Sequence, residues 1–168
     1  GPPPSPEVAV VTIEPKPVTL STELPGRTAA YLVAEVRPQV GGIIQKRLFT
    51  EGSLVQAGQP LYQIDPALYQ AALARSEAQL STLQLKEKRL KELLADKAVS
   101  QQDYDDTSAA LKSVQAEVQT ARINLKYTAI SAPISGRIGK SNVTVGALVT
   151  AHQPVALATI QQMDPMYV

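Results

Sequence analysis

The chain has 168 residues, enough for one ordinary domain or two small ones that bury roughly 70% of their extended surface. With 44% hydrophobic residues, 18% charged residues and a net charge of +1, it is neither an acidic nor a basic tail and has little long-range attraction for nucleic acid. An aromatic content of 4% also argues against a stacking platform for single strands. The absence of Cys excludes disulfides, thiolate metal sites and thiol nucleophiles.

Residues 1–34 are expected to form a tether followed by strands. The segment from Gly1 to Pro6 is rich in proline, which lacks an amide donor, so it predicts an extended tether. Alternating apolar residues beyond Glu7 then predict two half-buried strands. These residues are Val8, Val10 and Ile13 in the first strand, and Val18, Leu20 and Leu24 in the second.

An internal repeat with a shift of 94 residues is the most informative feature of the sequence. Residues 40–60 match residues 134–154 at ten of 21 positions without a gap, where about one or two matches would arise by chance. Each copy has the Gly turns and β-branched residues of short strands, and too little apolar surface to fold alone. Two copies facing each other therefore predict a small β-sandwich, with half-motifs at 35–65 and 129–163. Matching positions include Gly42/Gly136, Ile44/Ile138, Gly52/Gly146, Leu54/Leu148 and Gln59/Gln153.

Residues 66–128, between the two copies, have a helical pattern. Asp65 and Pro66 are typical of a helix start, with Asp as N-cap and Pro at the first helical position. Apolar residues then recur every seven positions, which predicts a helix of about 30 residues and about 45 Å. Two positions of each heptad form the seam, the stripe that faces the partner helix. One seam position holds Leu73, Leu80 and Leu94, interrupted by Glu87, and the other holds Ser76, Leu83 and Leu90.

A second helix is expected after a break at residues 96–99. Ser100 and Asp103 resemble a capping box in which Asp replaces the usual Glu. The seam of this helix holds Tyr104, Leu111, Val118 and Leu125 in one position and Thr107, Val114 and Ala121 in the other. Folding the two helices back on each other predicts an antiparallel coiled coil with the layers Leu94/Thr107, Leu90/Leu111, Glu87/Val114, Leu83/Val118, Leu80/Ala121 and Ser76/Leu125.

The predicted fold class is therefore α+β: a sandwich of two half-motifs with an inserted antiparallel helical hairpin. This plan resembles biotinyl and lipoyl carrier domains, and the hairpin between the halves resembles the periplasmic adaptors, or membrane fusion proteins, of RND-type tripartite multidrug efflux pumps, the MexA/AcrA group. The similarity covers nearly the whole chain. The segments that resemble this family most closely are 34–40 (AEVRPQV), 61–66 (LYQIDP), 121–125 (ARINL), 131–139 (SAPISGRIG) and 164–168 (DPMYV).

The resemblance implies a function and a site. Such adaptors link an inner-membrane RND transporter to an outer-membrane TolC-like channel, as a homo-oligomeric ring that is by family resemblance a hexamer, and they bind the channel through an Arg, a Leu and a Ser at the hairpin tip. Arg89, Leu93 and Ser100 have that spacing, whereas a later position that is acidic in some members is Ala110. The resemblance also implies a partial β-barrel from residues 1–34 and 164–168, and a periplasmic protein anchored to the inner membrane by an N-terminal lipid ahead of Gly1. We expect the chain to be a fragment.

Other interpretations remain at this point. An adaptor of an ABC-type exporter or type I secretion system shares the same plan. A lipoyl or biotinyl carrier would need its modified lysine on the turn between the half-motifs, whereas Lys97 lies at the end of a helix. His152 is expected to be a surface turn residue, and Asp103, Asp105 and Asp106 favour the dipole of a helix start without a metal. No nucleophile and base are apparent, so we expect neither an enzyme nor a cofactor.

Overall fold

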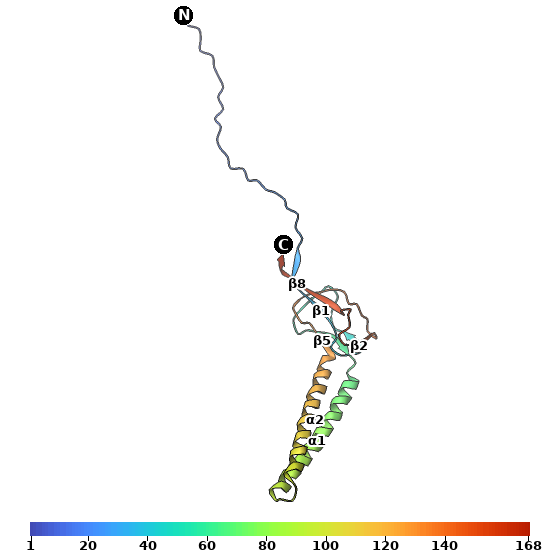
Figure 1. The fold of residues 1–168 in the computed structure, drawn as a ribbon. Helices are drawn as coiled ribbons and strands as arrows, with labels where there is room; N and C mark the ends of the chain where they lie inside the picture. Colours follow the sequence, from blue (N-terminus) through green and yellow to red (C-terminus); the bar gives the residue numbers. More distant parts are fainter.

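The computed structural model describes residues 1–168 as a small two-sheet body with a long helical hairpin extending from it (Figure 1). Residues 1–28 contain no helix or strand. The elements are β1 (Ala29–Val36), β2 (Gly42–Arg47), β3 (Leu54–Val55), β4 (Pro60–Ile64), α1 (Ala67–Ala95), α2 (Gln101–Tyr127), β5 (Ala129–Ser131), β6 (Gly136–Ile138), β7 (Leu148–Val149) and β8 (Ala158–Tyr167).

The two sheets are built by exchange of strands between the repeat copies. One sheet has the order β1-β8-β6-β3 and the other β5-β4-β2-β7. Strand β2 of the first copy therefore pairs with β7 of the second, and β6 of the second copy pairs with β3 of the first. The repeat makes β1 the counterpart of β5, β2 of β6, β3 of β7 and β4 of β8. Exchanging each strand for its counterpart turns the order of one sheet into the order of the other. The sandwich thus has an approximate internal two-fold symmetry, as the repeat predicts.

Loop hydrogen bonds repeat the same symmetry. The Gly52 N–H donates to the Ile138 carbonyl at 2.9 Å, and the Gly146 N–H donates to the Ile44 carbonyl at 2.8 Å. Gly58 has a positive φ of 84°, and its counterpart His152 has a φ of 56°. His152 is an exposed turn residue, as the sequence predicts, but it adopts a left-handed conformation that costs a side-chain-bearing residue about 1–2 kcal/mol.

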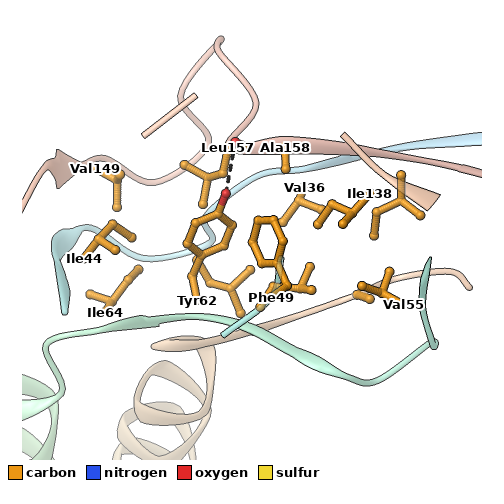
Figure 2. Packing of buried hydrophobic residues seen from close by; sticks show 14 of the residues in the cluster. Val36, Ile44, Phe49, Val55, Tyr62, Ile64, Ile138, Val149, Leu157 and Ala158 are labelled. Carbon is orange, nitrogen blue, oxygen red and sulfur yellow. Dashed lines mark hydrogen bonds between the residues drawn. The ribbon is translucent and has the colours of Figure 1, made fainter. Parts of the chain in front are cut away.

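The core lies between the two sheets and includes residues of both copies. Ile44 and Ile64 lie across the core from Leu157 (Figure 2), and Leu61 and Ile138 belong to the same cluster. The remaining core residues are Val36, Val40, Phe49, Val55, Tyr62, Ile130, Ala132, Val149, Ala158 and Ile160. Burial of this many apolar side chains, at roughly 1.5–3 kcal/mol each, makes the sandwich a stable base for the hairpin.

Tyr62 anchors a polar link across this core. Its hydroxyl lies 2.6 Å from the Ser141 hydroxyl and donates to the Leu157 carbonyl at 3.2 Å. Its ring meets Phe49 edge to face at a centroid distance of 5.2 Å. Burial raises the pKa of the Tyr62 phenol, and the hydrogen bond with Ser141 offsets part of that rise. The phenol is therefore neutral and acts as a structural bridge between the halves.

The helix caps form as the sequence predicts. The Ala67 N–H donates to the Asp65 carboxylate at 3.0 Å, so Asp65 satisfies a free amide at the start of α1, although Pro66 lies just before the first residue of the helix. The seam residues are also confirmed by their burial. Thr107, Val114 and Val118 are buried, and the other predicted seam residues of both helices are half-buried. Each helix is thus amphipathic along the predicted heptad positions.

The predicted pairing of the layers is wrong by one heptad. The Tyr104 hydroxyl donates to the Glu87 carboxylate at 2.8 Å, whereas the predicted layers put Glu87 and Tyr104 about 15 Å apart along the axis. At the base, β4 pairs with β5 at Gln63 and Ala129, so α1 begins level with the end of α2. Counting the same number of residues forward from Ala67, the start of α1, and backward from Tyr127, the end of α2, places Leu83 level with Leu111. Heptad spacing is unchanged by a shift of seven residues, so it cannot distinguish the two registers.

The structure contains neither of the two strands expected beyond Glu7. No strand of the structure pairs with residues 7–24, and the apolar side chains of this segment are exposed, with Leu20 at 91%. Alternation of apolar residues produces a strand only where a neighbouring strand supplies hydrogen bonds and a facing layer covers the apolar side. The first strand is β1, which pairs with β8.

Candidate functional site at the hairpin tip

The tip of the hairpin is a tight turn closed by backbone hydrogen bonds. The Lys97 N–H donates to the Leu94 carbonyl at 3.0 Å, and the Ala98 N–H donates to the Leu93 carbonyl at 2.8 Å. These two bonds form a Schellman motif, which satisfies carbonyls at the end of α1. Lys97 occupies the left-handed position of this motif with a φ of 57°, where glycine is the usual residue. The turn therefore has a defined shape.

Ser100 begins the second helix directly after this turn. Its hydroxyl oxygen accepts a hydrogen bond from the Asp103 N–H at 3.1 Å, which is the N-cap contact predicted from the sequence. The residue is exposed, and its hydroxyl hydrogen remains available to a partner. Ser100 can thus cap the helix and contact another protein at the same time.

Arg89 and Leu93 lie one helical turn apart on α1, just before the tip. Positions four residues apart share a helix face, and both side chains are outside the seam. Leu93 is 42% exposed, and Leu85, one turn before Arg89, is 59% exposed. Arg89 has no carboxylate partner, and its Nε lies 3.5 Å from the Leu85 carbonyl, which is a weak contact. Arg89 and Leu93 therefore lie within the last two turns of α1, and Ser100 lies directly before α2 on the other side of the tip turn.

This arrangement is suited to docking. A free guanidinium can bind a carboxylate or backbone carbonyls in a bidentate way, and the exposed Leu beside it supplies apolar contact area. The hairpin holds this surface about 43 Å from the sandwich, given 29 residues in α1. Figure 1 shows the tip at the far end of the molecule from the two sheets.

Glu87 and Tyr104 brace the helices behind the tip, and their contact was not predicted from the sequence. The hydrogen bond to Glu87 raises the pKa of the Tyr104 phenol, because it stabilises the protonated form. The interruption of the Leu seam by Glu87 was the available signal. Only the correct helix register would have placed Glu87 close enough to Tyr104 for their hydrogen bond to be predicted.

The other residues considered above form no site. The structure has no group of three or more His, Cys, Asp or Glu side chains placed to hold a metal ion, and this applies to Asp103, Asp105 and Asp106. Lys97 lies in the tip turn of the hairpin, far along the chain from the junction of the half-motifs. Neither helix is long and apolar enough to cross a membrane.

The fold is a two-sheet body with a long hairpin, and the exposed tip lies at the end of the hairpin away from the sheets (Figure 1). Residues 32–161 match the family described as RND MFP, barrel-sandwich hybrid domain, so the chain belongs to this family of membrane fusion proteins. It is 59% identical to multidrug resistance protein MexA of Pseudomonas aeruginosa, over all of this chain and 44% of that protein. It is 57% identical to the antibiotic efflux pump periplasmic linker protein ArpA of Pseudomonas putida, over 98% of this chain and 44% of that protein. The chain thus spans less than half the length of these relatives.

Solved structures agree with this assignment. A MacA-MexA chimeric protein containing the α-hairpin domain of Pseudomonas aeruginosa MexA matches with a TM-score of 0.74 and 36% identity, over 80% of this chain and 49% of the chimera. A putative efflux transporter from Bacteroides eggerthii has the same TM-score at 24% identity, over 80% of this chain and 41% of that chain, which supports the fold alone.

Proposed function

We propose that the chain is part of the periplasmic adaptor of a tripartite RND multidrug efflux pump. In this proposal the complete protein links an inner-membrane RND transporter to an outer-membrane TolC-like channel, and Arg89, Leu93 and Ser100 contact the channel. The observation that carries the proposal is the exposed pair Arg89 and Leu93 at the tip, together with membership of the RND MFP family. The protein has a mechanical role, without a catalytic residue or cofactor.

In this proposal each part of the chain has its own mechanical role. The half-motifs at 35–65 and 129–163 form a rigid base, and the hairpin at 66–128 is a strut. Residues 1–34 and 164–168 contribute to a β-barrel that is completed by other parts of the full protein. Support comes from β1 and β8, whose outer halves are exposed and carry apolar side chains such as Leu32 and Met166. We also propose a periplasmic location and an N-terminal lipid anchor, by similarity to the periplasmic linker proteins.

A ring of several copies, by family resemblance six, belongs to the same proposal. The tip of one hairpin offers one Arg and one Leu for contact, which is a small surface and therefore a weak site. Several tips held in one ring would bind a channel together, so that their affinities combine through a high effective concentration. An adaptor serving an ABC-type exporter would use the same geometry, but the family match favours the RND class.

The test uses the full-length protein in cells that lack their own adaptor. Arg89→Asp and Leu93→Ser should each reduce drug resistance to the level of the adaptor-deficient strain, while the helicity and melting temperature of the purified protein stay unchanged. Lys88→Asp is the matched control, because Lys88 is an exposed cation next to Arg89 on another side of α1. It should retain resistance.

Two outcomes would contradict the proposed site. Full resistance in both tip variants would show that these side chains do not contact a partner. A large loss of melting temperature would show that they are structural. Co-purification with an ABC transporter in place of an RND transporter would favour the alternative class.

A further inference from the structure

The hairpin joins the sandwich at the edge of one sheet, where the chain crosses between them twice. Helix α2 runs into β5 through the buried Thr128, and the Thr128 carbonyl accepts a hydrogen bond from the Ile64 N–H at 2.8 Å. Helix α1 follows β4 through Asp65, whose N–H donates to the Ile43 carbonyl at 2.8 Å. Because β4 and β5 are neighbouring strands, the two crossings lie only about 5 Å apart. The base of the long hairpin is therefore narrow.

A third contact widens this base. The Tyr69 hydroxyl, in the first turn of α1, donates to the Gly41 carbonyl at 2.5 Å. Gly41 directly precedes β2, and β2 lies beside β4 in the sheet order β5-β4-β2-β7. Since β2 and β4 are antiparallel, the start of β2 lies at the same sheet edge as the end of β4. The attachments thus lie on three successive strands and span about 10 Å.

The acceptor of this hydrogen bond belongs to a fixed part of the sandwich. Gly42 pairs with Val149 in the ladder between β2 and β7. A Cβ atom on Gly41 would lie 3.2 Å from the Val149 carbonyl oxygen, which shows how closely the two segments pack. Val40, on the other side of Gly41, is buried in the core. The Gly41 carbonyl is therefore held by the sandwich, and its hydrogen bond ties α1 to a rigid point.

Two tyrosines lie at the base of the hairpin, one on each helix. Tyr69 near the start of α1 and Tyr127 at the end of α2 are both half-buried, and both pack against the core. They differ in their hydroxyl groups, because the Tyr69 hydroxyl binds the Gly41 carbonyl and the Tyr127 hydroxyl makes no hydrogen bond within the chain. The pair thus separates the contribution of a hydroxyl from that of a packed ring.

The length of the hairpin amplifies any movement at the contact between Tyr69 and Gly41. The contact lies about 10 Å along the sheet edge from the Thr128 crossing, whereas the tip lies about 43 Å from the base. Opening the contact by about 3 Å, enough for one water molecule, tilts the hairpin by about 17° and moves the tip by about 13 Å. A hydrogen bond tolerates less than about 1 Å of elongation, so this tilt would carry Arg89 away from a partner group.

We propose that Tyr69 is a positioning residue, which fixes the direction of the hairpin relative to the sandwich through its hydrogen bond to Gly41. The inference rests on the proposed function, because the direction of the hairpin determines where the tip meets a channel. Tyr69 itself touches no partner and acts through the placement of Arg89 and Leu93. Without its hydroxyl the Gly41 carbonyl takes water as its donor, and the hairpin leans away from β2 on its two remaining attachments.

The test measures the direction of the hairpin in the full-length protein, without a partner and with no other cysteine present. Spin labels at Leu148→Cys on β7 and Lys91→Cys near the tip report the distance between sandwich and hairpin by pulsed electron paramagnetic resonance, and both side chains are exposed. Tyr69→Phe keeps the ring and removes the hydroxyl. It should lengthen this distance by up to about 4 Å, because β7 lies about 14 Å along the sheet edge from β5.

The matched control is Tyr127→Phe, which removes a hydroxyl that binds nothing and should leave the distance unchanged. A second label pair, Lys91→Cys with Gln119→Cys, lies within the hairpin and should give the same distance in every variant. Circular dichroism checks that both helices still form. In cells, Tyr69→Phe should lower drug resistance and Tyr127→Phe should retain it.

Three results would overturn the inference. The first is a distance distribution of Tyr69→Phe that coincides with that of the unmodified protein, and the second is an equal shift in Tyr127→Phe. The third is a shifted distribution with full drug resistance, which would show that the direction of the hairpin does not serve docking. The distance measurement needs no channel and leaves Arg89, Leu93 and Ser100 intact, so failure of the proposed tip contact and failure of this inference give different results.

Discussion

A pair of engineered cysteines can decide the helix register directly, because the chain contains no Cys. In the structure Leu83 is level with Leu111, whereas the register predicted from the sequence placed Leu90 there. The two registers differ by seven residues, which is about 10 Å along the helix axis. Disulfides require Cα atoms within about 7 Å of each other, so only one of the two pairs can close without movement of the backbone.

We expect Leu83→Cys with Leu111→Cys to oxidise within one chain, and Leu90→Cys with Leu111→Cys to remain reduced under the same conditions. Closing a loop of about 28 residues should stabilise the oxidised form by roughly 3.5 kcal/mol relative to the reduced form in the chain-entropy account. Thiol titration and non-reducing electrophoresis give the extent of oxidation, and urea unfolding gives the stability. Preferential oxidation of the Leu90 pair would refute the register derived from the Tyr104 to Glu87 hydrogen bond.

Two further predictions follow from the conformation of a turn and from an ionisable side chain. His152→Gly should raise the free energy of unfolding by about 1 kcal/mol, because glycine adopts the left-handed conformation without strain, as Gly58 does in the other copy; unchanged or lower stability in urea unfolding would contradict this. In an absorbance titration, Tyr104 should ionise at higher pH than a model tyrosine, so its hydrogen bond stabilises the fold below pH 10 and is lost as the pH rises through its raised pKa. Glu87→Gln should lower that pKa, since an amide acceptor lacks the negative charge, and an identical titration curve would count against the contact.

The sequence predicts those features that depend on local chemistry or on repetition. Asp65 and Ser100 cap helices because an acceptor next to a helix start satisfies free N–H groups wherever the helix lies in the fold. The internal repeat, with its shift of 94 residues, predicts a two-fold arrangement because two segments of similar sequence form similar strands. Gly52 and Gly146 then occupy equivalent turns.

The predictions that the structure does not reproduce concern features that depend on distant partners. The helix register is set by the pairing of β4 with β5 at the base and by the short turn at the tip, and neither is visible in the heptad pattern. The alternating residues between Val8 and Leu24 resemble strands, yet nothing in the structure pairs with them.

The position of the hairpin also affects how the sandwich can assemble. Strands from the two copies must meet across a long intervening chain, and the entropy cost of closing a loop rises with its length. The helices can form from contacts between residues that are closer in sequence, and once they are paired they bring Ile64 within a hydrogen bond of Thr128, at 2.8 Å. The helical hairpin therefore also holds the two half-motifs together, which converts a distant strand pairing into a nearly local one.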